Sequence, residues 1–462
     1  MKKIPVVACI GLILLLAGAS TALAKGQGEK PKELEKVEIT WWINPWRIVV
    51  PGVPEGKTLD GTEFIEWASK AYMEIHPNVT VTGVLVSNAE FPQKQAAAIA
   101  AGNTPNVIRL LSGLVELSRA GLLLPLDGYI SAADRADFVP VALADATVDG
   151  KVMQLPWNFG NNGMGITNLI YPPMFEASGV DWKKIVEKGW TMDEFVAIGK
   201  KVSKDTNGDG QNDVFLTGFQ AKAFDTDWPM VYNHGGRLLN DKETAFAVDS
   251  AETIAGYQFI VDAIYKHNIA PKGAEAADNY GVIRPFHAHQ IAMGNGGPYE
   301  IGRIDREVKA GNAQKFRPYV APYPEVPGKR RGTYLTSGGF SVFKKAKTPA
   351  TLEAAVDFAQ FLTSKEMLVR LESLLYISGR KSANAEMYKS PEWLEFKPDI
   401  ALYEKEISDY GVPFWGSQGF LPKWGKVKKY MQAASEAVYA RTKTPEQAMK
   451  DFIKDANKDA GF

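Results

Sequence analysis

The feature that most constrains the fold is an alternation of short β-rich runs and helical periods near the start of the chain. Residues 37–42 and 79–86 are β-rich, and residues 61–76 between them carry apolar side chains at helical spacing. An alanine-rich helical segment at 92–101 leads to a third predicted strand at 107–111. Strand, helix, strand, helix, strand is typical of parallel βαβ units with right-handed crossovers. The sequence therefore predicts an α/β fold that opens with a parallel sheet.

The N-terminus has the layout of a secretory signal peptide. Two lysines precede a long apolar run, and residues 22–24 form an Ala-Leu-Ala site just before Lys25. An uncleaved membrane anchor is the alternative, because the apolar run is close to spanning length. We expect residues 1–24 to be removed and residues 25–36 to form a flexible leader. We also expect the protein to be exported, to the periplasm or to the outer cell surface.

The single cysteine, Cys9, lies ahead of the main apolar run at 10–17. Lipidation at Cys9 would leave that run attached to the protein, so we interpret Cys9 as part of the signal peptide. The exported chain then has no disulfide, no thiol nucleophile and no cysteine metal site. A large hydrophobic core has to stabilise it, and the length of the chain is sufficient for two domains.

Charge and motif content argue against several classes of function. The chain has 53 basic and 53 acidic residues without a long basic stretch, so nucleic acid is not an expected partner. The opening βαβ units lack a phosphate-binding glycine loop, and the chain lacks zinc-type histidine spacing and the G-x-S-x-G turn of serine hydrolases. Its 11 Trp, 17 Tyr and 22 Phe exceed what a plain α/β core needs, which favours a binding site built from aromatic rings.

Seven short motifs follow one another along the chain. They are ITWW at 39–42, AGNTPNV at 101–107, LPLD at 124–127, DGKVMQLP at 149–156, GWTMDEF at 189–195, AM with GPY at 292–299, and GGF at 338–340 ahead of a helix at 354–363. In their order and spacing they resemble the family 1 extracellular solute-binding proteins, the group that includes maltose-binding protein. Asn106 stands where that family usually has Asp, and the strand end at 110–112 lacks the aromatic of maltose-type proteins. The resemblance therefore does not extend to maltodextrin specificity.

The resemblance implies a periplasmic-binding-protein fold of the type II-like class, with two α/β lobes, a hinge and a ligand cleft between the lobes. We expect residues 37–156 and 318–366 to form the N-terminal lobe, and residues 157–317 and 367–462 to form the C-terminal lobe. The family further implies a monomeric, non-enzymatic receptor. Its partners would be a small-molecule carbohydrate and the membrane permease subunits of an ABC importer.

A sugar presents apolar C–H faces and a belt of hydroxyl groups, which suit flat aromatic rings and polar side chains in loops that follow strands. Tyr299 also matches the cleft aromatic that follows Gly-Pro in the family. The predicted ligand-binding residues are Asn44, Trp46, Arg47, Glu90, Trp157, Asp227, Trp228, Tyr299, Glu300, Gly338, Gly339 and Trp415. For each tryptophan the alternative is a place in the core, and for the two glutamates it is a solvated or capping role.

One further motif could hold a metal ion. Residues 205–213 place an oxygen-bearing side chain at every second position around a glycine turn, as in calcium-binding loops. The predicted ligands are Asp205, Asn207, Asp209, Gln211 and Asp213. Leu216 occupies the position where an EF-hand needs a bidentate glutamate, so the alternative is a polar turn between a helix and a strand at 214–219. A structural calcium ion is the one cofactor that the sequence suggests, and no cofactor is required.

Two other classes of function remain open at this point. A secreted carbohydrate-active enzyme also needs aromatic rings and carboxylates in a cleft. A surface adhesin or scaffold would be exported in the same way. Turnover of glycosides would identify the enzyme, whereas tight binding of a small solute without turnover would identify the receptor. Which sugar or polyol binds does not follow from the sequence.

Overall fold

The computed structural model describes most of the chain after residue 34. The described ranges are 35–45, 61–87, 90–110, 113–158, 167–224, 226–278, 280–309, 311, 316–335, 338–413 and 424–460, with the backbone alone described at 372–374 and 424. The predicted signal peptide, nearly all of the predicted leader, and Trp46, Arg47 and Trp415 of the predicted site lie outside these ranges. Within them, no helix combines the length and the apolar character needed to cross a membrane.

The first sheet has five strands in the order β2-β1-β3-β11-β6. Strand β1 pairs in parallel with β2 and β3, whereas β11 runs antiparallel to β3 and β6. These strands are β1 (Val37–Ile43), β2 (Val79–Leu85), β3 (Val107–Leu110), β6 (Leu155–Asn158) and β11 (Gly338–Val342). The helices between the first three strands are α1 (Thr62–Ile75) and α2 (Phe91–Ala100). The predicted βαβαβ opening is therefore confirmed, with boundaries within about two residues of those expected.

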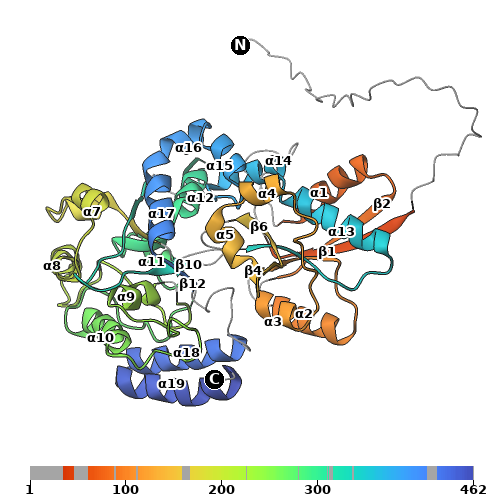
Figure 1. Cartoon of the computed structure of the whole chain (residues 1–462). Coiled ribbons are helices and arrows are strands. Elements are labelled where there is room, and N and C mark those ends of the chain that lie inside the picture. Colours follow the sequence, from red (N-terminus) through yellow and green to blue (C-terminus); the bar gives the residue numbers. More distant parts are fainter. Residues whose placement is uncertain are drawn as a thin grey trace, which may run out of the picture. The chain divides into compact units, whose positions relative to one another are not determined.

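Both faces of this sheet are covered, and the two adjacent tryptophans of β1 show how. Successive side chains of a strand point to opposite faces, so Trp41 and Trp42 enter different clusters. Trp41 packs against Phe64 of α1 and against Phe358 of α13 (Pro349–Leu362). Trp42 joins the cluster with residues of α3 (Leu114–Arg119). Figure 1 shows α1 and α13 on one side of β1 and β2, and α2 and α3 on the other.

The second sheet has three strands in the order β8-β7-β9, all antiparallel to their neighbours. They are β7 (Thr167–Ile170), β8 (Met293–Gly296) and β9 (Tyr319–Ala321). The helices that share a hydrophobic cluster with this sheet are α6 (Pro172–Glu176), α7 (Trp182–Lys188), α8 (Met192–Val202), α9 (Asp227–Asn233), α10 (Ala251–Tyr265), α18 (Trp424–Tyr439) and α19 (Pro445–Ala460). The GWTMDEF motif starts α8, where Thr191 and Glu194 form a reciprocal capping box.

The remaining elements connect or flank the two sheets. In the first part of the chain they are α4 (Ala132–Asp137), α5 (Pro140–Asp145), β4 (Thr147–Val148) and β5 (Lys151–Val152). Later in the chain they are α11 (Ile283–His287), α12 (Pro298–Lys309), β10 (Thr333–Leu335), α14 (Lys365–Leu368), η1 (Val369–Leu374), α15 (Lys381–Met387), α16 (Pro391–Glu395), α17 (Lys397–Tyr410) and β12 (Gly411–Pro413). Strands β10 and β12 pair in parallel as a small sheet of their own.

Strand pairing differs from the expected lobe boundaries at two places. Residues 318–366 were assigned to the first lobe, but β9 pairs with β7 and completes the second sheet. The chain therefore returns to the first sheet between Ala321 and Gly338, later than expected. Trp157 was assigned to the second lobe but belongs to β6, because the ladder with β11 continues to Asn158.

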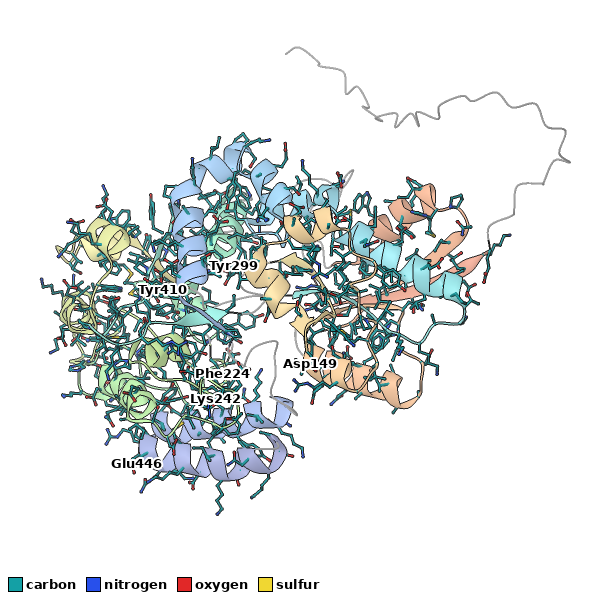
Figure 2. The ribbon with its side chains drawn as sticks, viewed as in Figure 1. Asp149, Phe224, Lys242, Tyr299, Tyr410 and Glu446 are labelled. Atoms are coloured by element: carbon teal, nitrogen blue, oxygen red, sulfur yellow. The ribbon has the colours of Figure 1, made fainter. Side chains whose placement is uncertain are left out.

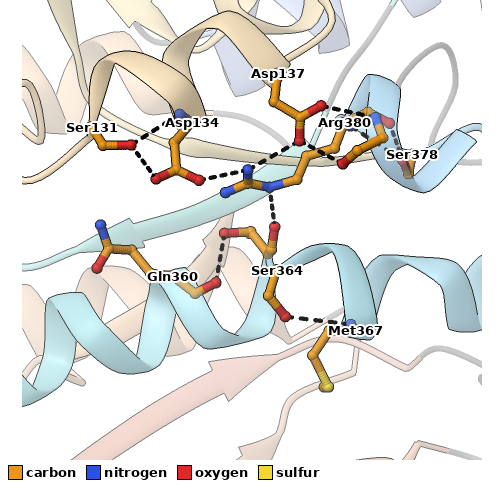
Figure 3. A network of polar contacts seen from close by, with 10 residues as sticks. Ser131, Asp134, Asp137, Gln360, Ser364, Met367, Ser378 and Arg380 are labelled. Atoms are coloured by element: carbon orange, nitrogen blue, oxygen red, sulfur yellow. Dashed lines mark hydrogen bonds and ion pairs between the residues drawn. The ribbon is translucent and has the colours of Figure 1, made fainter. Parts of the chain in front are cut away.

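A third connection between the regions is anchored by Arg380. Its Nη1 donates to Asp134 and Asp137 of α4, and its Nε donates to the carbonyl of Thr363 at the end of α13 (Figure 3). Ser378 forms a bridge to Asn158 at the end of β6. Charge-assisted hydrogen bonds from a nearly buried guanidinium hold this segment against two different elements. The backbone just after η1 is thereby fixed at the end of the first sheet.

Candidate functional site

Three predicted or neighbouring side chains meet at the carboxyl end of the first sheet. Asn44 follows β1, Arg109 lies on β3, and Trp157 lies on β6. Arg109 has no exposed surface; its Nη1 donates to Oδ1 of Asn44, and its guanidinium lies 4.8 Å from the centre of the Trp157 ring. Because ligands of open parallel sheets bind outside the carboxyl ends of the strands, this is the edge where a site is expected.

A second group starts at the N-terminus of α12, directly after β8. Tyr299 is the second residue of α12 and is labelled in Figure 2; it is 6% exposed. Its ring stacks on that of Tyr376, with centroids 5.1 Å apart and planes 10° from parallel. Buried side chains of α12, among them Ile301, also join the hydrophobic cluster that contains Trp157. The predicted cleft aromatic is thus covered by a tyrosine from the segment that follows η1.

Tyr376 links the two groups electrostatically. Burial raises the pKa of its hydroxyl to about 12; the Glu300 carboxylate adds to this rise, and the Arg109 cation opposes it. In turn, burial lowers the pKa of Arg109, and the interaction with Tyr376 opposes that shift. The structure therefore brings Asn44, Arg109 and Trp157 together with Tyr376 and, through it, with Tyr299 and Glu300. We call these six residues the Tyr376 cluster.

Glu300, predicted as a ligand contact, is engaged within the protein. It is 5% exposed, and its carboxylate lies 2.7 Å from Nε2 of His287 and accepts a 3.0 Å hydrogen bond from Nε of Arg303. Burial raises the pKa of this carboxyl, but the hydrogen bonds from His287 and Arg303 outweigh it and hold the pKa below its ordinary value. The side chain anchors the start of α12. A sugar hydroxyl could bind this carboxylate only in competition with His287 and Arg303.

Asp227 and Trp228 were predicted to bind ligand, but the structure places them inside the second hydrophobic core. Trp228 has no exposed surface and packs between Tyr232 and Tyr257, at ring distances of 5.5 and 6.2 Å. The carboxylate of Asp227 accepts hydrogen bonds from Tyr439 and Thr226. These residues take the core role that was the alternative for every tryptophan. Trp157 is likewise 1% exposed, and its ring packs on Phe64 and Phe340 in the first core.

The remaining described candidates also have structural explanations. Glu90 is exposed and accepts a 2.7 Å hydrogen bond from Oγ of Ser87. A Cβ at Gly339 would lie 2.1 Å from the carbonyl oxygen of Leu155, so glycine is needed there for the approach of β11 to β6. Gly338 lies opposite Asn158, where the register of this ladder shifts. The two glycines therefore serve the packing of β11 against β6, and they give no evidence of a ligand contact.

In the loop at 205–213, side-chain oxygens accept hydrogen bonds from backbone amides of the same loop. The two oxygens of Asp205 accept from the amides of Gly208 and Gly210, at 2.6 and 2.7 Å, and Asp213 accepts from Thr206. These backbone hydrogen bonds lower the pKa of Asp205. Among the residues that the structure describes, no group of three or more acidic, histidine or cysteine side chains is arranged to hold a metal ion. Calcium binding at this loop remains a prediction.

The strand expected after this loop is absent from the described structure. Residues 214–219 form only two isolated bridges, Lys204 with Val214 and Phe215 with Ile291. The Phe215 amide instead donates to Gln290, and the Leu216 amide donates to Ile269. The backbone amides at 215 and 216 therefore form hydrogen bonds with residues far away in the sequence and not with a neighbouring strand. The β-propensity of the segment alone does not predict these partners.

Two members of the Tyr376 cluster were missed at the level of the sequence. Arg109 lies within an apolar run that reads as a buried strand, and its cation is unexpected there. A signal was available, because an arginine in such a run needs a polar partner at the end of a neighbouring strand, and Asn44 provides one. Tyr376 lies in an LLYISGR stretch without periodicity, and no local signal marks it.

Comparisons with known proteins agree with this fold. The profile of the bacterial extracellular solute-binding proteins matches residues 55–368. A putative binding protein of Brucella abortus is 22% identical over 394 residues, covering 84% of this chain and 87% of that protein. The maltotriose-binding protein of Pyrococcus abyssi is 24% identical over 339 residues, covering 72% of this chain and 66% of that protein.

Solved structures give the same picture at low identity. An ABC substrate-binding protein from Listeria monocytogenes in complex with cycloalternan superposes with a TM-score of 0.71 at 20% identity, covering 93% of this chain and all of that one. The maltose/maltodextrin-binding domain from Bdellovibrio bacteriovorus bound to maltotriose has a TM-score of 0.68 at 19% identity, covering 91% and 99%. These matches show the two-lobed fold. Because the family profile spans more than half of its length, the chain belongs to the bacterial extracellular solute-binding protein family.

Proposed function

We propose that the protein is the carbohydrate-binding component of an ABC importer and that it captures its sugar at the Tyr376 cluster. The observation that carries the proposal is the meeting of an aromatic stack, Tyr299 on Tyr376, with a buried amide–guanidinium pair, Asn44 with Arg109. The names of similar proteins support the same class of ligand, since they include a maltotriose-binding protein and sugar-bound receptors.

The chemistry of the cluster suits a sugar. Flat rings match the apolar C–H faces of a pyranose and lose little conformational entropy when they bind it. Amide and guanidinium groups match hydroxyl oxygens, because each hydroxyl that leaves water needs a hydrogen-bonding partner. Asn44 is 4% exposed and is already held by Arg109, so its orientation is fixed before a ligand arrives. Preorganisation of this kind lowers the entropic cost of binding.

The rest of the proposal follows from the family. The protein would be exported, would release its ligand to permease subunits in the membrane, and would catalyse no reaction. Closure of the two lobes around the sugar would exclude water from the contacts. A secreted glycosidase is the competing function, and glycoside turnover is the measurement that separates it from a receptor.

A thermal-shift screen tests the binding function directly. The exported chain would be melted with maltose, maltotriose, cycloalternan, α-D-tagatose and a wider panel of sugars and polyols, with amino acids as a control set. A ligand at a hundred times its dissociation constant stabilises the fold by about 2.7 kcal/mol. We expect at least one sugar to raise the melting temperature without being consumed. Stabilisation by amino acids and by no sugar, or turnover of a glycoside, would contradict the proposal.

A further inference from the structure

The two rings of the aromatic stack are not equivalent. Tyr299 is 6% exposed, and the ring of Tyr376 lies parallel to it at 5.1 Å. Tyr376 itself is partly exposed. A sugar approaching the stack therefore meets the outer ring first, and it can reach Tyr299 only after Tyr376 has moved.

The orientation of Tyr376 keeps its hydroxyl away from solvent. Desolvation raises the pKa of this hydroxyl to about 12, and the charged groups that act on it are Glu300, Arg109, Arg306 and Arg303. Arg109 and Glu300 are 0% and 5% exposed, so the hydroxyl on which they act lies on the buried side of the ring. What Tyr376 offers outward is apolar ring surface, which is the part of a tyrosine that stacks on a pyranose.

The backbone beside Tyr376 is held in an unusual conformation. Leu375 has a φ of 52°, in the left-handed region that a branched, bulky residue rarely adopts. Its side chain is 3% exposed and packs against α12, where a Cβ at Gly302 would lie 3.1 Å from it. Conformations of this kind persist only where the surroundings determine them, and they are concentrated at ligand-binding sites. This turn sends Leu375 into α12 and lays Tyr376 over Tyr299.

The chain after Tyr376 is fixed as well. The amide of Ser378 donates to Oδ1 of Asn384 at 2.8 Å, and the amide of Gly379 donates to the carbonyl of Trp157 at 2.9 Å. Arg380 then ties the segment to α4 and to the end of α13 (Figure 3). The backbone is therefore anchored on both sides of Tyr376, by the packing of Leu375 on α12 and by these hydrogen bonds.

We infer that Tyr376 is the ring that contacts the sugar and that Tyr299 is its support, on which the inner face of Tyr376 rests. The inference builds on the proposed function and assigns the ligand-facing surface to a residue that no motif marks. It replaces the expectation that Tyr299 is itself the stacking platform. The ligand class is a pyranose with an apolar face, stacked on the outer face of Tyr376.

The order of the rings can be tested without a ligand. Hydroxyl-radical footprinting with mass spectrometry would compare oxidation of Tyr376 and Tyr299 in the exported chain. We expect Tyr376 to be labelled and Tyr299 to be protected, and Tyr299 to become labelled in Tyr376→Ala. Tyr280, which is 55% exposed, serves as the internal standard for an accessible tyrosine. Labelling of Tyr299 with protection of Tyr376 would overturn the inference.

A matched pair of substitutions tests the contact itself, with maltotriose as the first probe and the sugars that stabilise the wild type as the others. Leucine keeps apolar bulk but removes the flat face. Tyr376→Leu should therefore weaken binding about 10- to 100-fold, whereas Tyr299→Leu, which still supports the outer ring, should weaken it by less than about fivefold. Tyr376→Phe should bind within about threefold of the wild type, because the hydroxyl faces inward.

The outcomes separate the inference from the function on which it rests. Sugar binding by the wild type with equal losses in the two leucine variants, or with the larger loss in Tyr299→Leu, would overturn the inference and leave the function standing. Binding of no sugar by the wild type would contradict both. Tyr280→Ala is the control for substitution of an exposed aromatic, and its affinity should equal that of the wild type. Circular dichroism of each variant verifies that the fold is intact.

Discussion

Asp227-Trp228 and Tyr299-Glu300 look alike in the sequence, yet the structure gives them different roles. Each pairs an acid with a large aromatic in the first turn of a helix. Asp227 and Trp228 on α9 are enclosed by the second core. Tyr299 and Glu300 on α12 lie in the Tyr376 cluster, next to the end of the first sheet. Local composition therefore does not distinguish a core aromatic from a site aromatic.

What distinguishes them is the set of elements that each helix packs against. Helix α9 is packed tightly on α10, since a Cβ at Gly256 would lie 2.7 Å from Cα of Val231. Tyr439 of α18 packs on α9 as well, and its hydroxyl donates a hydrogen bond to Asp227. Helix α12 instead starts where β8 ends, and its first turn meets Tyr376, His287 of α11 and, at Gly297, Tyr403 of α17. The two pairs therefore differ in their neighbours: Trp228 meets only the second core among the contacts described above, whereas Tyr299 meets a partly exposed ring beside the end of the first sheet.

The largest expected effect belongs to Trp228. If it is a core residue, Trp228→Ala should lower the free energy of unfolding by about 3–5 kcal/mol, because it removes a fully buried ring and leaves a cavity. Urea denaturation measures this, and sugar affinity of the folded fraction should stay unchanged. Trp182→Ala is the matched control: Trp182 is only partly buried and donates to Glu176, so the loss should be clearly smaller. A sugar affinity lowered tenfold with normal stability would return Trp228 to the binding site.

The acid of the second pair should give an intermediate effect with a definite pH dependence. Glu300→Gln should cost about 1–3 kcal/mol at neutral pH, because it weakens charge-assisted bonds to His287 and Arg303. The folded-state pKa of Glu300 is depressed, so its stabilisation is complete above the ordinary pKa and is lost as the pH falls through the folded value. The difference between wild type and variant should therefore shrink as the pH is lowered from 7 toward 3.5.

Glu404 is a control for this experiment, because its pKa is shifted in the opposite direction to that of Glu300. Burial raises the pKa of Glu404, which accepts a hydrogen bond from Tyr388. Its charged form is penalised in the folded state at neutral pH, and that penalty disappears as the pH falls through the raised folded value. Relative to Glu404→Gln, the wild type should thus gain stability on acidification. Parallel trends in the two variants would show that Glu300 is not held as an ion by its two neighbours.

The comparison also shows what the sequence can and cannot predict. Helix starts follow from local chemistry: α8 begins at a capping box on Thr191, and α12 begins at Pro298, a residue type that suits the first helical position. The opening parallel strands follow from periodicity. Arg109 and Tyr376 were missed because their roles depend on partners far away in the chain, Asn44 in one case and Tyr299 in the other. No local window contains that information.

Strand β9 was misassigned for the same reason. Tyr319–Ala321 is a short apolar run after a proline, which fits either sheet. Its place is decided by antiparallel pairing with β7 and by Asp399 of α17, which accepts a 2.7 Å hydrogen bond from the Val320 amide. Both contacts are long-range. Boundaries between lobes that the chain crosses more than once are therefore the least predictable part of such a fold.

The smallest expected effect concerns the loop at 205–213, which extends the comparison to polar residues. Its carboxylates, like that of Asp227, already accept hydrogen bonds from the protein itself, in this case from its own backbone. Calcium would have to compete with those bonds, and Leu216 provides no bidentate carboxylate, so affinity should be modest.

We predict that millimolar calcium raises the melting temperature of the wild type by about 1–4 °C relative to chelator, since roughly 1 kcal/mol of added stability shifts a protein of this size by a few degrees. Asp205→Ala combined with Asp209→Ala should abolish the rise, whereas magnesium should not reproduce it, because a small octahedral ion fits such a flexible loop poorly. Equal melting temperatures with calcium and with chelator, together with no calcium by elemental analysis of the purified protein, would show that the loop is a polar turn whose side chains serve only its own backbone.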